Sequence, residues 1–145
     1  MEALFKIARR AQRLTSGAVF LLVFSTPEVK RLIIELNTEG QLRFGKLSDG
    51  STLPDYSRIS QDLFDKPDGP IQLFDTGDFY DSFTIQSVTK EFIQISADPI
   101  KGDTNLFERY GIDVLGLTDE NIEVLNEMVI PRIIEYVKTE LLQDL

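Results

Sequence analysis

The chain has 145 residues, and 42% of them are apolar, which is enough to bury one hydrophobic core of ordinary domain size. We therefore expect a single domain over residues 1–145. Cysteine, histidine and tryptophan are absent, which excludes disulfides, thiol nucleophiles, imidazole bases and the usual protein ligands of zinc and haem. The net charge of −9 argues against general nucleic-acid binding, because phosphate contacts need clustered Lys and Arg side chains.

Charge is unevenly distributed between the two ends of the chain. Apolar residues at helical spacing predict an amphipathic helix over about 1–16, and its other side carries the basic residues Lys6, Arg9, Arg10 and Arg13. Acidic residues dominate residues 103–145 and include Glu120, Glu123 and Glu127. We identify these two sets as candidate contacts between copies of the chain. Two solvated helix faces are the simpler alternative.

Two further helices are predicted after the basic segment. The apolar run "GAVFLLVF" (17–24) is far shorter than the ~20 residues that span a bilayer, and we favour a helix there, although its periodicity does not separate helix from strand. "STPEVKRLIIELNTEGQLRFG" predicts a helix over about 27–43. Thr26 is its candidate N-cap, and Pro27 suits the first helical position. We expect no membrane contact and synthesis in the cytoplasm.

Residues 45–72 are rich in glycine and proline, which predicts a long loop with at most one short helix in its middle. Because loops of this length in compact domains are often functional or mobile, we expect it to become ordered against a partner. Asp62, Asp65 and Asp68 recur at every third residue, whereas a calcium loop of the EF-hand type needs acids at every second position. We therefore predict no metal site and no cofactor.

The second half of the chain begins with alternating apolar residues that predict a β-hairpin over 83–97. A short helix over about 103–110 should end at Gly111. Thr118 then caps a predicted helix over 119–143, which Pro131 should kink. Apolar residues form two stripes on this helix, more than one packing partner needs. We expect both stripes to lie in the core, with a subunit interface as the alternative.

The stretch "LFDTGDFYDSF" (73–83) has two incompatible interpretations. Asp75-Thr76-Gly77 after two apolar residues is how a retropepsin-type aspartic protease presents its catalytic carboxylate. The same residues also suit a helix start, in which Thr76 caps and Asp78 occupies the first turn. The helix-start motif comprises Thr76, Gly77, Asp78, Phe79 and Ser82.

A protease of this size must be a homodimer whose two Asp75 carboxylates share one proton. Asp78 and Asp81 would bring further negative charge to such a pair. The chain also lacks a glycine-rich flap and the apolar-Gly-Arg-Asp/Asn stretch expected later in that family, and it continues instead into one hairpin and a long charged helix. We favour the helix start and retain the homodimeric aspartic protease as the alternative.

Several segments in their order along the chain resemble a group of small phage proteins. They are "LNTEGQLRFG", "LSDGSTLPDYS", "QLFDTGDFYDSFTI", "LFERYG" and "VLGLTDENIEVLNEMVIPRIIEYV". The group is found in phages and prophages of Bacteroides-type bacteria and is similar to tail-completion or neck proteins of the head–tail junction. In that wider family a Thr-Gly-apolar-x-x-Ser motif starts a helix before a hairpin. Thr76, Gly77, Phe79 and Ser82 correspond to it.

The resemblance covers about residues 32–137 and implies an α+β fold, with several helices packed on a small antiparallel β-sheet. It implies a non-enzymatic virion structural protein of the neck or tail that forms a ring with copies of itself. Its other partners would be portal, connector and tail proteins, and DNA would only pass through the channel. We expect an acidic surface facing that channel to repel phosphate and let the genome slide.

Overall fold

The computed structural model describes Lys6 and residues 16–142. Of the predicted basic helix over 1–16, the structure describes only Lys6 and Ser16. Arg9, Arg10 and Arg13 lie outside the described residues. Lys6 is helical and exposed. None of the described helices combines the length and the apolar composition that a bilayer-spanning helix needs.

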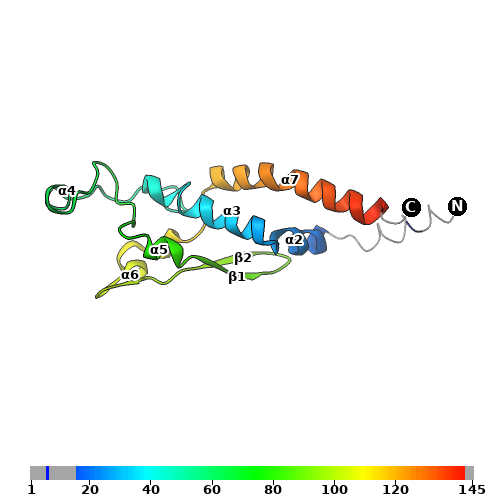
Figure 1. Cartoon of the computed structure of the whole chain (residues 1–145), viewed down its shortest axis with the longest axis horizontal. Helices are drawn as coiled ribbons and strands as arrows, with labels where there is room; N and C mark the ends of the chain where they lie inside the picture. Colours follow the sequence, from blue (N-terminus) through cyan, green and yellow to red (C-terminus); the bar gives the residue numbers. More distant parts are fainter. Residues whose placement is uncertain (1–5, 7–15, 143–145) are drawn as a thin grey trace.

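The protein is elongated, and its elements lie in three layers (Figure 1). The helices α2 (Ser16–Phe24) and α3 (Pro27–Asn37) form the middle layer. The C-terminal helix α7 (Asp119–Leu142) packs along one side of them, and the hairpin of β1 (Thr84–Val88) and β2 (Ile93–Ser96) lies along the other. The short helix α4 (Arg58–Phe64) stands at one end of the molecule, opposite the end formed by α2 and the last turns of α7. This arrangement is the predicted α+β fold.

The hairpin over 83–97 is confirmed. Strands β1 and β2 pair antiparallel, with Ile85 opposite Ile95 and Val88 opposite Ile93, and the register shifts between Ile85 and Ser87. Such a bulge lets one strand carry an extra residue and increases the local twist. The inward residues of the hairpin pack on the middle helices.

A second two-stranded sheet was not predicted. Strand β3 (Ile100–Lys101) pairs with β4 (Thr104–Asn105), so the helix expected over 103–110 begins only at Leu106, as α6 (Leu106–Tyr110). Its cap is Asn105, whose side-chain oxygen accepts hydrogen bonds from the backbone N–H of Phe107 and Glu108. The predicted stop at Gly111 is confirmed.

The predicted helix over 27–43 is too long by six residues. Helix α3 ends at Asn37, and a 3-10 turn, η1 (Leu42–Phe44), follows after a reversal of the chain. The N–H of Gly40 donates to Glu35 O across the helix end, and the released chain buries Leu42 completely. Pro27 does occupy the first helical turn. Thr26 precedes the helix, but its hydroxyl donates to Val23 O instead of capping α3.

Helix α7 agrees with the predicted span and is kinked, with Pro131 inside it. Thr118 caps it by accepting a hydrogen bond from the N–H of Asn121 at 3.2 Å. Leu125 and Val129 are buried against α2 and α3. The second apolar stripe consists of Ile130, Ile134, Val137 and Leu141. Its first two members are about half exposed, so the expectation that both stripes lie in the core is wrong.

The interior consists of two adjoining hydrophobic clusters. One lies under α2, α3 and α7, and the other lies between the loop 45–72, α5 (Asp78–Asp81) and α6. Ile95 of the hairpin contacts both clusters. The long loop takes part in the second cluster through Leu47 and Leu53, which are buried. The loop is thus anchored at its start, and α4 is the one short helix that the sequence allowed there.

Candidate functional site

The "DTG" segment lies in a turn that leads into α5, beside the second small sheet. The structure shifts the predicted cap by one residue, because Gly77, with φ of +95°, occupies the N-cap position. The Thr76 hydroxyl oxygen accepts a weak hydrogen bond of 3.3 Å from the N–H of Asp78, so it still supports the first turn. Glycine suits the N-cap here because a positive φ strains other residues.

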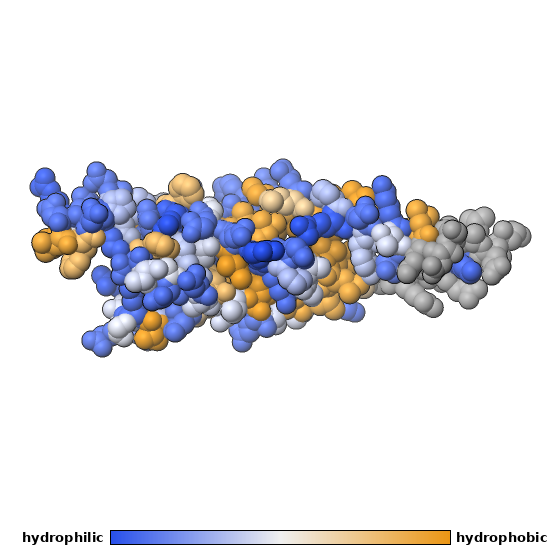
Figure 2. All heavy atoms as spheres, in the orientation of Figure 1, coloured by the Kyte–Doolittle hydropathy of each residue, from blue (hydrophilic) through white to orange (hydrophobic). Residues whose placement is uncertain are grey.

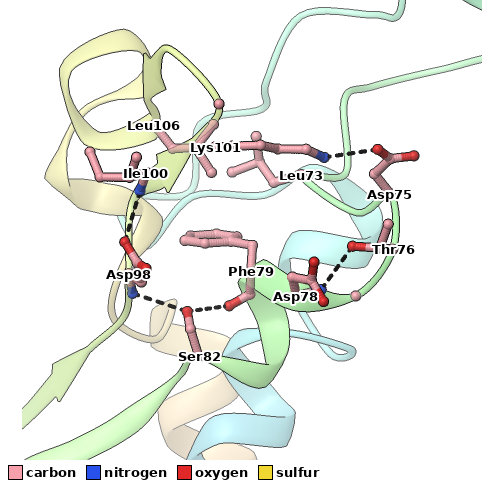
Figure 3. Close-up of a pocket in the computed structure, with 12 residues that line it drawn as sticks. Leu73, Asp75, Thr76, Asp78, Phe79, Ser82, Asp98, Ile100, Lys101 and Leu106 are labelled. Carbon is pink, nitrogen blue, oxygen red and sulfur yellow. Dashed lines mark hydrogen bonds and ion pairs between the residues drawn. The ribbon is translucent and has the colours of Figure 1, made fainter.

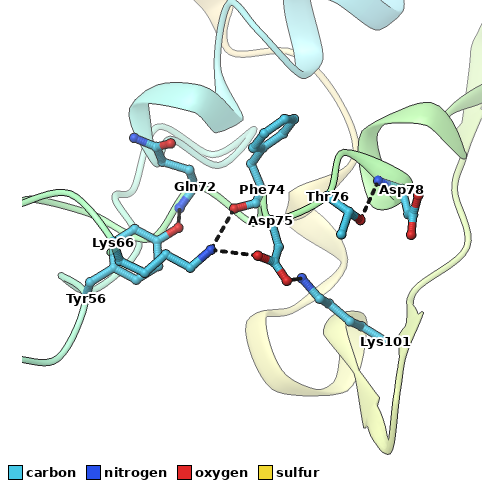
Figure 4. A network of polar contacts seen from close by, with 8 residues as sticks. All are labelled: Tyr56, Lys66, Gln72, Phe74, Asp75, Thr76, Asp78 and Lys101. Carbon is cyan, nitrogen blue, oxygen red and sulfur yellow. Dashed lines mark hydrogen bonds and ion pairs between the residues drawn. The ribbon is translucent and has the colours of Figure 1, made fainter. Parts of the chain in front are cut away.

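Asp75 lies between two lysines that come from distant parts of the chain (Figure 4). Lys66 Nζ is 3.3 Å from Oδ1, and Lys101 Nζ is 3.2 Å from Oδ2. The hydrogen bonds from Lys101 and Lys66 lower the pKa of the Asp75 carboxyl. The carboxylate therefore stays ionised and joins the end of the 45–72 loop to β3. Its side chain remains 54% exposed, so it is not enclosed in a water-free site.

Three further contacts fix the residues just before Asp75. Lys66 Nζ also donates to the backbone oxygen of Phe74 at 3.2 Å. The Arg43 guanidinium stacks on the Phe74 ring at 3.6 Å from its centroid, a favourable cation–π geometry. The Tyr80 hydroxyl donates to Gln72 O at 2.6 Å, and burial raises the pKa of this hydroxyl. The segment is therefore held in one conformation by side chains from three other regions.

A hollow of about 220 Å³ lies between α5 and the small sheet (Figure 3). Its apolar wall is formed by Leu73, Phe79 and Leu106, while Asp75 and Lys101 lie at its rim. Ser82 closes one side, because its hydroxyl donates to Phe79 O at 2.6 Å and accepts from the N–H of Asp98 at 3.0 Å. The polar groups of Asp75, Lys101 and Ser82 each have a hydrogen-bond or ion-pair partner within the protein.

The predicted helix-start residues therefore lie together, and their contacts hold the turn into α5 in place. Thr76 and Gly77 start α5, Phe79 is buried, and Ser82 ties the end of α5 to the β2–β3 connection. Lys66 and Lys101 were missed. No local pattern could have indicated them, since they lie 9 residues before and 26 residues after Asp75.

A second polar cluster was also missed by sequence reasoning. The side chains of Asn37 and Gln41 are fully buried at 0% and 1% exposure. Asn37 donates to Val114 O at 3.1 Å and accepts from the N–H of Gly116 at 2.8 Å. Gln41 donates to Gly116 O at 2.8 Å and accepts from the N–H of Thr118 at 2.9 Å. We call this cluster the amide clamp, because it fastens the start of α7 to the end of α3.

Two exposed apolar surfaces lie outside the core. The first is the α4 tip, formed by Ile59, Leu63 and Phe64, which are 67%, 72% and 69% exposed. The second is the α7 flank, formed by Ile130 and Ile134, which lie one turn apart on α7 and are 50% and 49% exposed. Figure 2 shows hydrophobic atoms at the α4 end of the molecule and along its middle. Contiguous exposed apolar side chains usually mark contact sites. The acidic residues predicted as subunit contacts, Glu120, Glu123 and Glu127, are exposed on α7.

Comparison with known proteins gives no relative for this chain: no protein-family model, no curated protein and no solved structure matches it. Within the described part of the chain, no group of three or more acidic residues is placed to hold a metal ion.

Proposed function

We propose that the protein is a non-enzymatic structural subunit of a phage neck or tail, a head–tail connector or tail-completion protein that acts through contacts with copies of itself and with portal or tail proteins. The neck or tail assignment comes from the resemblance of residues 32–137 to phage proteins, and the observation that supports action through protein contacts is the pair of exposed apolar surfaces, the α4 tip and the α7 flank. A ring subunit needs two different surfaces, one for each neighbour, and its interface must close by rotation. Its location would be the virion, after synthesis in the host cytoplasm.

The surroundings of Asp75 support a structural function. An aspartic protease needs two carboxylates that share a proton, which requires that one of them has a raised pKa. Asp75 instead forms two ion pairs with lysines that lower its pKa. In this arrangement the carboxylate links its own segment to those of Lys66 and Lys101. This is a structural role, and it involves no substrate.

Deleting the gene from the phage or prophage that carries it tests the proposal. We expect the deletion to give separate heads and tails by electron microscopy, because a missing connector leaves both parts without their joint. Supplying the wild-type chain in trans should restore complete particles. Complete, infectious particles in the absence of the gene would contradict the proposal.

The same complementation assay separates the two functional classes. Asp75→Asn removes the carboxylate that a protease requires, so a protease would lose all complementation. A structural subunit loses only part of its ion pairing and should still give particles at permissive temperature. Failure of Asp75→Asn to complement, with the chain folded and present at wild-type level, would favour the protease.

A further inference from the structure

The α4 tip is carried on a stem that holds it away from the body of the protein. The N–H of Tyr56 donates to Gly69 O at 2.9 Å, and the N–H of Ile71 donates to Pro54 O at 2.8 Å, so the two sides of the loop pair with each other. Lys66 fastens the base of α4 to Asp75 and Phe74 O. The tip is therefore a fixed projection, and a surface fixed in advance loses little entropy on binding.

Helix α4 itself is well formed, yet it buries none of its residues in the body. The Ser57 hydroxyl caps it by accepting from the N–H of Ser60 at 3.1 Å. Leu63 and Phe64 are the last two residues of α4, and in the sequence they stand between the acidic residues Asp62 and Asp65. An apolar tip with two carboxylates next to it in the sequence matches an apolar hollow that is lined in part by a basic residue.

Such a hollow lies at the opposite end of the molecule, between α2 and α7. Its volume is about 230 Å³, and it is lined by Leu22, Val23, Thr26, Arg132 and Tyr136. A cavity of about 150 Å³ already accommodates a benzene ring, so this hollow has room for the ring of Phe64. Leu22 is half exposed at the hollow, and Arg132 supplies the positive charge.

From this match of shape, polarity and charge we propose that the α4 tip of one copy docks into the α2–α7 hollow of a second copy. The contact joins two different surfaces from opposite ends of the chain, so it is head-to-tail, and repetition of it builds a ring when the rotation closes and a filament when it does not. The inference rests on the proposed function and deepens it, because it assigns the α4 tip and the α2–α7 hollow to the contact between copies and leaves the α7 flank for contact with portal or tail proteins.

Mixing two interface variants tests the contact directly. Leu63→Glu with Phe64→Glu disables the tip, and Leu22→Glu disables the hollow. We expect sedimentation velocity to show oligomers for the wild-type chain and monomers for each variant alone. An equimolar mixture should form a complex of two chains and nothing larger, because each variant keeps one working surface. Ile112→Glu, at a position that is 64% exposed and outside both surfaces, is the matched control and should associate like the wild type.

Charge exchange and cross-linking extend the test. Arg132→Glu should weaken association, and Asp62→Arg with Asp65→Arg in the other chain should restore it. Because the chain has no cysteine, Leu63→Cys mixed with Leu22→Cys should give a disulfide between the two chains under mild oxidation. A mixture of Leu63→Cys with Ile112→Cys should not.

Any one of three results would contradict the proposed contact. The wild-type chain could stay monomeric at millimolar concentration, either interface variant could associate like the wild type, or the mixed variants could stay monomeric. These results are separable from the proposed function. A chain that is present in virions while the tip variant still associates normally would retain the function and lose the contact. A chain absent from virions whose mixed variants form the two-chain complex would retain the contact and lose the function.

Discussion

Gln41 holds Thr118 in place across 77 residues of sequence, with its side-chain oxygen accepting from the N–H of Thr118 at 2.9 Å. Thr118 in turn caps α7. The orientation of the longest helix, and of the exposed flank it carries, therefore depends on a buried amide at the end of α3. Buried amides make such a joint specific, because any other register leaves their donors and acceptors unpaired.

Removing one member of the amide clamp should be strongly destabilising. Asn37→Leu leaves Val114 O and the N–H of Gly116 without their partners in a buried place. We expect a loss of about 2–4 kcal/mol in the free energy of unfolding, measured by urea denaturation. Asn126→Ala, at an exposed position of α7, is the control and should change stability by about 0.5 kcal/mol or less. Equal effects of the two variants would show that the clamp contributes little.

Two glycines with positive φ allow a matched comparison of backbone strain and steric conflict. At Gly45 an added Cβ would lie 2.4 Å from the Cβ of Pro70, whereas at Gly50 nothing lies within 4 Å. Gly50→Ala should cost about 1 kcal/mol for the left-handed conformation alone. Gly45→Ala should cost more, because the loop must also move away from Pro70. Thermal unfolding of both variants checks this, and an equal cost would mean that the Pro70 side of the loop yields without strain.

The ion pairs of Asp75 predict a specific dependence of stability on pH. Its pKa is lowered in the folded protein, so the carboxylate contributes stability above its ordinary pKa of about 3.9. This contribution is lost as the pH falls through the lowered value. The difference in melting temperature between the wild type and Asp75→Asn should thus be largest near neutral pH and should vanish at low pH.

Asp78→Asn is the control for that titration, since no ion pair of Asp78 is found among the described residues. Its melting temperature at neutral pH should be close to that of the wild type. If Asp75→Asn did the same, the lysine contacts would make no contribution to folding.

If the proposed function holds and α7 faces the channel, its acidic residues should affect genome movement. Glu120, Glu123 and Glu127 are exposed on one helix, and acidic groups that face a channel repel phosphate. The triple change to lysine should slow DNA ejection from assembled particles, measured as release in a receptor-triggered or chaotrope-triggered assay at low salt. Raising the salt concentration should reduce the difference, because it screens these charges. Normal ejection at low salt, or failure to assemble at all, would contradict a channel position.

Sequence reasoning succeeded where the physical signal is local. The periodicity and cap of residues 118–142, the alternation in the hairpin and the proline and glycine content of residues 45–72 each determine structure over a few consecutive residues. It failed where distant residues decide the outcome. Helix α3 ends at Asn37 because the Asn37 side chain bonds to Val114 O in the amide clamp and Leu42 is buried in the core. Both contacts involve residues far away in the sequence, so the local pattern does not indicate them.

The same distinction applies to the candidate site. The helix start at 76–78 was recognisable from residue types, although Gly77 took the cap position expected of Thr76. The lysines that neutralise Asp75 and the exposure of Ile130 and Ile134 were not recognisable. An apolar stripe has the same pattern whether it faces its own core or a neighbouring molecule.

The central claim, that the chain is a structural subunit of a phage neck or tail, is tested most directly by quantitative mass spectrometry of purified, DNase-treated particles. A structural subunit should be present in a fixed ratio to the portal, at a count of about 6 or 12 per particle, as closed rings of a portal-linked collar require. Absence of the chain from complete particles would contradict it.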